Sequence, residues 1–374
     1  MDGGVFVEKT GIGVVGCGDI SGIYLTNLTT KFANIQVVGV CDLVDEKAEK
    51  AVKQYGISKK YKDMHELFAD PAVDIVLNLT RPYQHLGVSM AAIAAGKHVY
   101  SEKPLGASLE EGTEIRDAAA KKGVLVGGAP DTFLGAGIQT CRKLIDDGYI
   151  GKPLGATAFF ACPGHERWHP DPDFYYQYGG GPLFDMGPYY ITALVNLLGS
   201  VVAVNGMASK TYASRIITAE QKFGETFDVD VDTYEAATLA FECGTICTMM
   251  MSFDVHAHNL PILEIYGTEG TLVAPDPNYF DGPVKLFRRE QQEFLTVPLA
   301  FGYRDNSRGL GLVDLSCAIK KGRKPRAGID LYYHVLEVMA CIQKSSAEKK
   351  EINIVSRAEK PSPMLTGLLP GTID

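Results

Sequence analysis

A glycine-rich turn near the N-terminus restricts the possible fold more than any other feature of this sequence. Residues Gly13 to Ser21 read G-V-V-G-C-G-D-I-S, so the pattern G-x-G-x-x-S follows an expected strand and opens an expected helix. Gly16 allows the tight turn, and Gly18 lets the backbone approach a pyrophosphate, whose charge the helix N-terminus favours. Ser21 stands where a third glycine or alanine is usual, and it is small enough for close packing. The turn therefore predicts a dinucleotide-binding α/β domain.

The segment up to about Pro130 alternates apolar strands with amphipathic helices. The pattern predicts strands at 11–15, 36–41, 73–79, 97–100 and 124–127. It predicts helices at 20–32, near 48–55 and near 86–93, and one more from the capping box of Ser108 and Glu111 to Gly123. Such alternation builds a parallel sheet with crossover helices. We therefore expect residues 1–130 to form a Rossmann domain.

One carboxylate indicates which dinucleotide the turn binds. Asp42 ends the second expected strand, 24 residues beyond Gly18, where an acid can accept hydrogen bonds from a ribose diol. The same carboxylate would repel a 2′-phosphate, and Leu43 follows it in place of an arginine that could hold one. The sequence therefore predicts NAD rather than NADP. The alternative is a glycine-rich turn with an incidental surface aspartate.

Beyond Pro130 the pattern changes to strands that follow one another along the chain. A helix is expected at 138–147, followed by strands at 154–162, 201–209, 233–241, 245–253, 263–266 and 285–288. Consecutive strands favour an antiparallel sheet. Helices near 189–197, 310–321 and 331–344 would cover one of its faces, and the tail from Lys360 would lie extended on the surface or on a neighbouring subunit. We expect residues 131–374 to form this second α/β domain, which would bind substrate and form oligomers.

Composition excludes several classes of protein. The 374 residues include 36 Lys+Arg and 45 Asp+Glu, a net charge of −9, whereas nucleic-acid binding needs a basic surface. The eight cysteines form no C-x-x-C pair, which is typical of free thiols in a reducing compartment. The N-terminal segment lacks the apolar run of a signal peptide, and no stretch reaches the ~18 apolar residues of a membrane span. We expect a cytoplasmic protein with no nucleic-acid or membrane partner.

Two histidines have a spacing that some metal sites use. His256 and His258 alternate along one side of an expected strand, but no third soft ligand accompanies them in the sequence. Histidines so placed are more often surface residues. We expect no metal site.

A lysine stands where the ligand of a parallel sheet is usually bound. Ser101-Glu102-Lys103-Pro104 follows the strand at 97–100, and open parallel sheets place ligands at such carboxyl ends. An ammonium group there can hydrogen-bond a substrate oxygen and, if burial lowers its pKa, take a proton as a hydride leaves carbon. Taken alone, a lysine after a strand is more often a solvated charge.

Taken together, these segments resemble the Gfo/Idh/MocA oxidoreductase family. The resemblance rests on the glycine turn, Asp42, N-L-T-R-P at 78–82 with His85, Glu102-Lys103-Pro104, and G-G-G-P-L-F-D-M-G-P-Y at 179–189. It implies an NAD(P)-binding Rossmann domain followed by an α/β domain with an open, mainly antiparallel sheet, and a catalytic Lys103. The cofactor-binding residues that it implies are Gly16, Gly18, Asp19, Ile20, Asp42, Thr80, Pro82, His85, Glu102 and Lys103.

The same resemblance implies two further catalytic residues. The family commonly carries a D-x-G-x-H segment, and Asp185 and Tyr189 occupy its acidic and histidine positions here. Their fourfold spacing places both on one face of a helix. A phenol, with a pKa near ~10, is a weaker base than an imidazole unless a cation such as Lys103 lowers that pKa. Tyr189 could instead bind the reacting oxygen while Lys103 moves the proton, or could only pack in the core.

The segment at 164–176 combines polar and aromatic groups as a sugar site does. Trp168 could stack on a pyranose while His165, His169 and Glu166 bind hydroxyls, and either histidine could replace the family's missing one. Arg308 is a further candidate from another loop over the cleft. The alternative is an aromatic loop that packs on a neighbouring subunit.

These expectations describe an NAD-dependent dehydrogenase that oxidises a secondary hydroxyl of a sugar, cyclitol or glycoside to a ketone, or runs the reverse. Similar G-G-G-P-x-F-D-M-G-P-Y-Y and W-H-P segments in a subgroup of the family imply glycosides or longer saccharides, with the C3 hydroxyl as target. Alternatives are a dehydrogenase for a dihydrodiol or imine, a non-catalytic regulator, and an enzyme that keeps its cofactor bound between two substrates. The resemblance also implies a homo-oligomer built through the open sheet.

Overall fold

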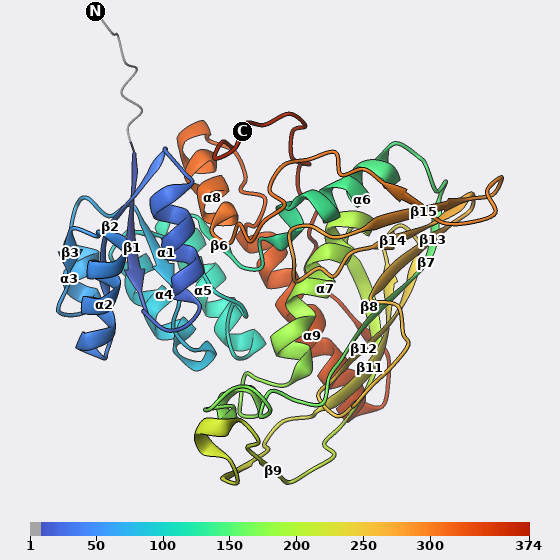
Figure 1. The fold of residues 1–374 in the computed structure, drawn as a ribbon, viewed down its shortest axis with the longest axis horizontal. Coiled ribbons are helices and arrows are strands. Elements are labelled where there is room, and N and C mark those ends of the chain that lie inside the picture. The colour runs from blue at the N-terminus through green and yellow to red at the C-terminus, as the bar shows by residue number, and fades with distance from the viewer. Residues whose placement is uncertain (1–8) are drawn as a thin grey trace, which may run out of the picture.

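The computed structural model describes residues 9–374, so the expectation about a signal peptide concerns residues that largely lie outside it. The N-terminal part of the chain is built on a six-stranded parallel sheet in the order β3-β2-β1-β4-β5-β6 (Figure 1). Its strands are β1 (Thr10–Val15), β2 (Ile35–Cys41), β3 (Lys59–Lys60), β4 (Ile75–Asn78), β5 (His98–Ser101) and β6 (Val126–Gly128). The predicted Rossmann architecture is confirmed.

Helices cross over between these strands as the periodicity predicted. They are α1 (Ser21–Thr30), α2 (Asp45–Tyr55), α3 (Met64–Ala69), α4 (His85–Ala94) and α5 (Leu109–Lys122). Ser108 caps α5 by accepting the Glu111 N–H at 3.3 Å, and Gly123 ends the helix in a left-handed conformation. The short β3 and α3 were not predicted. The strand β3 is two exposed lysines without an apolar pattern, and α3 is only six residues long.

The C-terminal half is built on a nine-stranded sheet in the order β16-β15-β14-β13-β7-β12-β11-β8-β17. Its neighbours pair antiparallel except for β7 and β12, which run parallel, so the expected mainly antiparallel sheet is confirmed. The strands are β7 (Pro153–Ala161), β8 (Val201–Ser209), β11 (Tyr234–Phe241), β12 (Ile246–Ser252), β13 (Leu263–Gly267), β14 (Gly270–Ala274), β15 (Val284–Arg288), β16 (Leu295–Val297) and β17 (Ile352–Asn353).

Three helices cover one face of this sheet, whereas the helix expected at 310–321 packs elsewhere. The three are α6 (Ala136–Asp146), α7 (Pro182–Leu198) and α9 (Ile329–Glu348), which pack against β14, β12 and β8 respectively. The helix α8 (Leu310–Lys321) packs against β6 of the first sheet instead. An apolar stripe shows that a helix covers a sheet but not which one, so that expectation was wrong. The division of domains at residue 130 stays a prediction.

A short antiparallel ribbon stands apart from both sheets. It consists of β9 (Ser214–Ile216) and β10 (Thr226–Asp228), with the 3₁₀-helix η4 (Glu220–Lys222) between them (Figure 1). The segment 164–178, which includes η3 (Asp173–Tyr175), lies beside it, since the N–H groups of Thr218 and Ala219 both donate to the Glu166 carbonyl. The other 3₁₀-helices are η1 (Pro82–Gln84) and η2 (Thr132–Leu134).

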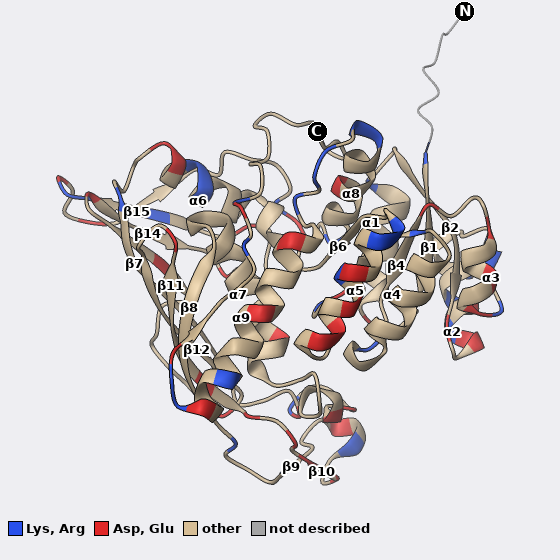
Figure 2. Ribbon diagram, turned by 180° about the vertical axis from the view of Figure 1, so that it is seen from behind, with Lys and Arg blue, Asp and Glu red and all other residues tan. Residues whose placement is uncertain are grey.

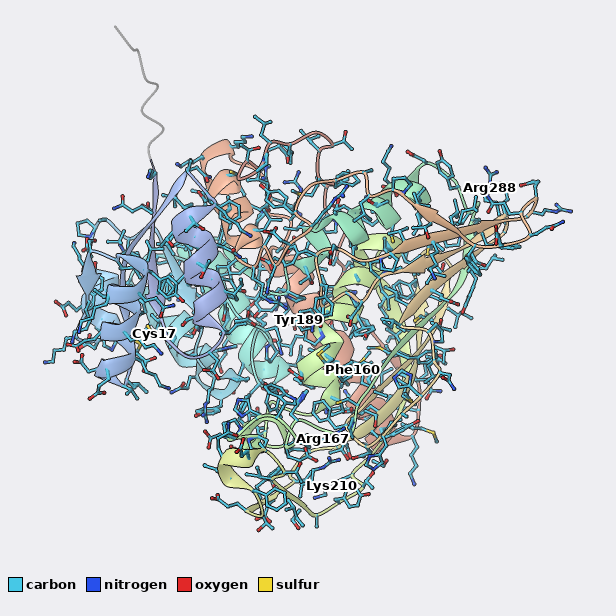
Figure 3. The ribbon with its side chains drawn as sticks, viewed as in Figure 1. Cys17, Phe160, Arg167, Tyr189, Lys210 and Arg288 are labelled. Carbon is cyan, nitrogen blue, oxygen red and sulfur yellow. The ribbon has the colours of Figure 1, made fainter. Side chains whose placement is uncertain are left out.

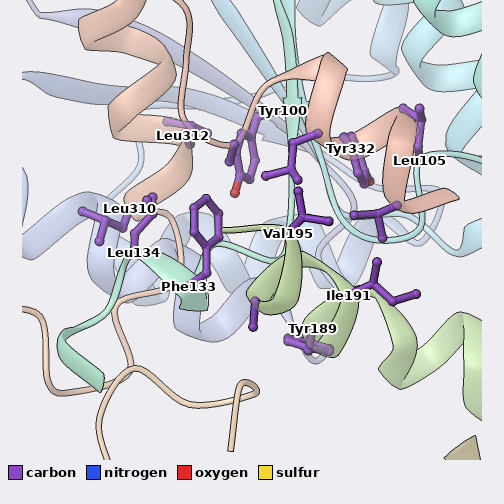
Figure 4. Packing of buried hydrophobic residues seen from close by; sticks show 14 of the residues in the cluster. Tyr100, Leu105, Phe133, Leu134, Tyr189, Ile191, Val195, Leu310, Leu312 and Tyr332 are labelled. Carbon is purple, nitrogen blue, oxygen red and sulfur yellow. The ribbon is translucent and has the colours of Figure 1, made fainter. Parts of the chain in front are cut away.

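A continuous apolar core joins the two halves. Side chains from β5, η2, α7, α8 and α9 meet in it, including Tyr100, Phe133, Val195, Leu312 and Tyr332 (Figure 4). The C-terminal tail packs on the same chain, because the Arg326 guanidinium donates to the Ser362 carbonyl at 2.9 Å and Met364 is buried. Across residues 9–374, none of the helices combines the length and the apolar character that crossing a bilayer requires.

Candidate active site

A cavity of about 770 Å³ opens at the carboxyl ends of β1, β2 and β4. Of the predicted cofactor residues, Gly16, Gly18, Asp42 and Thr80 line it. Gly16 has a φ of 98°, and a Cβ there would lie 2.8 Å from the Leu79 carbonyl oxygen. A Cβ on Gly18 would meet nothing within 4 Å, so the backbone at this position is open to an approaching group. The cavity is also lined by Val15, Leu43, Val44, Lys47, Arg81 and Val88.

Asp42 is held so that its carboxylate can bind a diol. One oxygen accepts the Cys17 N–H at 2.7 Å and the other accepts the Val44 N–H at 2.8 Å. Each oxygen keeps a lone pair for a further donor. The glycine turn and this fixed carboxylate on the cavity wall fit the pyrophosphate and ribose of NAD. Burial, followed by the charge of Asp42, raises the pKa of the neighbouring Cys17 thiol to about 12, so the thiol has little nucleophilic character.

The other predicted cofactor residues are not among those that line the cavity. Asp19 and Ile20 are exposed, and Pro82 begins η1. His85 is fully buried, with Nδ1 2.7 Å from the Pro104 carbonyl oxygen and Nε2 3.0 Å from that of Thr80. It therefore joins the segments that follow β4 and β5. Their roles toward the cofactor stay predictions.

Lys103 contacts a carboxylate from the other half of the molecule. Its Nζ donates to Asp185 Oδ1 at 2.6 Å and to the Asp185 carbonyl at 2.9 Å. The other carboxylate oxygen, Oδ2, lies 2.9 Å from His165 Nε2. Glu102, next to the lysine, accepts the Tyr24 hydroxyl at 2.8 Å and the Lys103 N–H at 3.0 Å. Lys103, Asp185 and His165 thus form one hydrogen-bonded chain, and each side chain is less than a fifth exposed.

Tyr189 lies one helical turn beyond Asp185, at the junction of the two halves (Figure 3). Its ring centroid is 5.6 Å from Lys103 Nζ, and its hydroxyl interacts with the Arg308 guanidinium. Arg308 is anchored by Asn278 Oδ1 at 2.8 Å and Asn306 Oδ1 at 2.9 Å. The structure therefore brings Arg308 to the same group of residues as Lys103.

The charges of this group determine its protonation. Burial alone would lower the pKa of Lys103, but Asp185, and then Tyr189 and Glu102, raise it above its usual value. Burial would raise the pKa of the Asp185 carboxyl, but Lys103 and His165 hold it well below its usual range. Burial raises the pKa of Tyr189 more than the cations lower it. Lys103 is therefore an ammonium, and the lowered pKa that would make it a free base is contradicted.

The segment 164–178 carries an aromatic cluster over these residues. The His165 ring centroid lies 4.3 Å from that of Tyr175, 4.6 Å from that of Phe253 and 5.4 Å from that of Trp168. The Trp168 Nε1–H donates to His165 Nδ1 at 3.3 Å, and 59% of Trp168 is exposed. His169 accepts the Asp171 N–H at 3.0 Å and is not among the groups that contact Asp185.

Several residues of the site were assigned differently or missed by sequence reasoning. Glu166, expected to bind sugar hydroxyls, is buried and paired with Arg215 at 2.6 Å, so it faces the interior. Tyr175 was missed although its ring packs against that of His165, because it appears in the sequence only as one of several aromatic residues. Arg81 lines the cavity and its guanidinium lies 5.2 Å from the Phe174 ring centroid, a contact between halves that no local pattern signals. No group of three or more potential metal ligands occurs within residues 9–374.

Two family models match the chain. Residues 10–128 match "Oxidoreductase family, NAD-binding Rossmann fold", and residues 138–273 match "GFO/IDH/MocA C-terminal domain". The chain belongs to the Gfo/Idh/MocA oxidoreductase family. Residues 10–128 are therefore an NAD-binding Rossmann domain, as the glycine turn and Asp42 predicted.

Individual members of the family align with parts of this chain. An inositol 2-dehydrogenase/D-chiro-inositol 3-dehydrogenase of Lactiplantibacillus plantarum is 39% identical over 148 residues, which is 39% of this chain and 42% of that protein. A myo-inositol 2-dehydrogenase of Thermotoga maritima is 25% identical over 70% of this chain and 74% of its own length. A levoglucosan dehydrogenase of Pseudarthrobacter phenanthrenivorans is 26% identical over 61% of this chain and 62% of that enzyme.

Solved structures show that the family fold extends over most of the chain. A levoglucosan dehydrogenase in complex with NADH and levoglucosan superposes with a TM-score of 0.80 at 22% identity, covering 93% of this chain and all of the other. An aldose-aldose oxidoreductase of Caulobacter crescentus reaches 0.77 at 22% identity over 92% of this chain and all of the other. At this level of identity the likeness concerns the fold.

Proposed function

We propose that the protein is an NAD-dependent dehydrogenase that oxidises a secondary hydroxyl of a sugar, cyclitol or glycoside to a ketone, or catalyses the reverse. The supporting observation is the hydrogen-bonded chain of Lys103, Asp185 and His165, which lies at the end of β5, next to the strand β4 that borders the dinucleotide cavity. NAD, when bound, supplies the acceptor for the hydride of the substrate carbon. The protein's residues position that carbon and move the hydroxyl proton.

Because the pKa of Lys103 is raised, its role differs between ketone reduction and alcohol oxidation. In ketone reduction the Lys103 ammonium hydrogen-bonds the carbonyl oxygen and donates its proton to the forming hydroxyl. In alcohol oxidation Lys103 must first lose a proton, and the hydrogen-bonded chain that runs from Lys103 through Asp185 to His165 is the path along which we propose that it leaves. Tyr189, kept neutral by burial, hydrogen-bonds the reacting oxygen.

The aromatic cluster supports a carbohydrate as substrate. Trp168 presents an exposed ring beside His165, and an indole stacks on the C–H face of a sugar. We propose His165, His169 and Arg308 as further groups for substrate hydroxyls, since the His169 ring centroid lies 5.2 Å from that of Trp168 and Arg308 lies beside Tyr189. The relatives named for inositol and levoglucosan agree with a cyclic polyol. We propose glycosides and their C3 hydroxyl as the first substrate and position to test.

We propose that the protein is a homo-oligomer built through the open face of the large sheet, the side that α6, α7 and α9 leave uncovered. The strands β7, β8 and β12 carry no charged residue, Glu235 of the intervening β11 is buried, and Figure 2 shows few charges along these strands. Met207 and Ile246 on this face are 78% and 60% exposed. A broad uncharged face is typical of an interface. The eight free cysteines support a cytoplasmic location.

A substrate panel tests the proposal. Purified protein is incubated with NAD and free sugars, inositols, O- and C-glycosides, a dihydrodiol and a cyclic imine, and NADH absorbance is followed. The expected result is turnover of at least one cyclic polyol and a ketone in the product by NMR. Turnover of only the dihydrodiol or imine would identify a different dehydrogenase. Binding of NAD and sugar without turnover would identify a regulator. NAD(H) absorbance in the purified protein would show that the cofactor stays bound between two substrates.

A further inference from the structure

A buried arginine stands behind the segment that carries His165. Arg215 belongs to β9 and is 8% exposed. Its Nη1 donates to Glu166 Oε1 at 2.6 Å and to the Pro163 carbonyl at 3.3 Å. Its Nη2 donates to the Phe253 carbonyl at 3.1 Å and to the Asp254 carboxylate. One guanidinium therefore ties together three separate parts of the chain.

The contacts of Arg215 continue to the backbone of His165. The second oxygen of Glu166 accepts the Tyr176 hydroxyl, and that hydroxyl accepts the His165 N–H at 3.2 Å. The guanidinium also lies 5.0 Å from the Tyr176 ring centroid. On the other side, the Phe253 ring packs at 4.6 Å from the His165 ring. Arg215 thus holds groups that contact both the backbone and the ring of His165.

Gly164 shows how closely the segment is pressed against this cluster. Its φ is 100°, and a Cβ there would lie within 2.6 Å of Glu166 Oε2, the Tyr176 hydroxyl and Arg215 Nη1. The chain therefore enters the segment 164–178 with no space between its backbone and the cluster. A change in the cluster would be transmitted directly to the next residue, His165.

The charges make the arrangement depend on the arginine. Arg215, Glu166 and Asp254 are each less than a tenth exposed by side chain, and one cation faces two carboxylates. A buried carboxylate that loses its partner is strongly disfavoured. Without the guanidinium, we expect Glu166 to turn toward water and to draw the segment away from Asp185. Arg215 itself has no contact with Lys103, Asp185 or Tyr189 among its hydrogen bonds and ion pairs.

We propose that Arg215 is a positioning residue, which through Glu166 and Tyr176 holds His165 Nε2 against the Asp185 carboxylate. This inference rests on the proposed function of His165 as a group that exchanges the proton with Asp185. It predicts that Arg215 matters to the reaction only while His165 is present.

A double-mutant cycle tests this dependence. Arg215→Gln, His165→Asn and the double variant are assayed for kcat/KM with the best substrate of the panel, with the NAD Kd as a control for folding. We expect Arg215→Gln to lower kcat/KM by roughly tenfold or more, to leave the NAD Kd within about twofold, and to add no further loss in the His165→Asn background. Arg215→Lys should recover part of the loss, since an ammonium keeps the charge but not the fork of donors.

Matched variants separate the explanations. Arg167→Gln removes an exposed arginine of the same segment and should leave kcat/KM unchanged. If Arg215→Gln does not fold, Glu166→Gln leaves a balanced Arg215 and Asp254 pair and serves in the same cycle. The proposal would be overturned if kcat/KM were unchanged in both Arg215→Gln and Glu166→Gln. It would also be overturned if the fold-loss in kcat/KM of the double variant equalled the product of the losses of its two single variants. A fully active His165→Asn would overturn the role of His165, and a wild-type protein without turnover would overturn the proposed function.

Discussion

At the residue scale, the chemistry of each group depends on a neighbour that is distant in sequence. Lys103 and Asp185 could be predicted, because the lysine follows a parallel strand and the aspartate lies in a segment that resembles the family's. The sequence suggested that either His165 or His169 replaces the family's histidine, but it could not show which one contacts Asp185, since residues 164–178 have no periodic pattern. The pKa of Lys103 could not be predicted, because its sign depends on Asp185 being 2.6 Å away.

The protonation of Lys103 predicts different pH dependences for reduction and oxidation. Because its pKa is raised, the ammonium form dominates at neutral pH and reduction should be independent of pH there. Oxidation requires the proton to leave, so its kcat/KM should increase as pH rises from about 6 to about 9. Initial rates in both directions across that range measure this. Oxidation that is fastest at the acidic end would contradict the assignment.

Trp168 offers a test of the sugar-binding surface. Trp168→Ala removes the exposed ring, so we expect KM for the sugar to increase by roughly tenfold or more while KM for NAD stays within about twofold. Trp168→Phe keeps an aromatic face and loses the N–H that donates to His165. Its KM for the sugar should therefore lie between that of wild type and that of Trp168→Ala. Equal increases in both KM values for the alanine variant would argue against stacking.

At the scale of elements, periodicity predicted where helices and strands form better than how they pack. The helix at 310–321 was predicted with the bounds it has, yet its partner is β6 of the first sheet. The reason lies in Asp131, which follows β6 and accepts the N–H groups of Gly309 at 2.8 Å and Gly311 at 3.0 Å. A cap supplied from 178 residues away leaves no local signal in the sequence.

Asp131 gives a stability prediction with a pH signature. Burial raises its pKa to about 6, above that of an unfolded aspartate, so the folded state binds the proton more tightly and loses stability as pH rises from about 4 to about 6. Asp131→Asn keeps an acceptor oxygen and should lack this loss. Asp131→Ala removes the cap and should lower the free energy of unfolding by about 2 kcal/mol. Urea unfolding at about pH 5 and about pH 8 distinguishes the three proteins, and identical pH dependence in wild type and Asp131→Asn would contradict the role.

At the scale of the whole molecule, the two halves share one core while the candidate active-site residues come from both. Composition predicted a globular acidic chain, and the resemblance implied the two-part fold. The open side of the sheet was implied by the same resemblance, and the structure agrees along β11, where every second residue is buried. We propose that a second molecule covers that side, and the sequence pattern of one strand carries no signal for such a partner.

The open face predicts association that a charge should weaken. Met207→Lys combined with Ile246→Lys places two cations on this face, so we expect the protein to elute as a smaller species than wild type, which should be a dimer or tetramer. Met207→Leu keeps the apolar surface and should elute as wild type does. Light scattering coupled to size-exclusion chromatography gives the masses. A monomeric wild-type protein would contradict an interface on this face.

The comparison of wild type with Lys103→Ala in NADH formation tests the central claim most directly. With NAD and the panel of cyclic polyols, the wild-type protein should form NADH with at least one substrate. Lys103→Ala should bind NAD with a Kd within about twofold of wild type, since the cavity wall does not include Lys103, and should lose roughly 100-fold or more of kcat/KM. Wild type that forms no NADH with any polyol, or a Lys103→Ala variant that turns over as wild type does, would contradict the account.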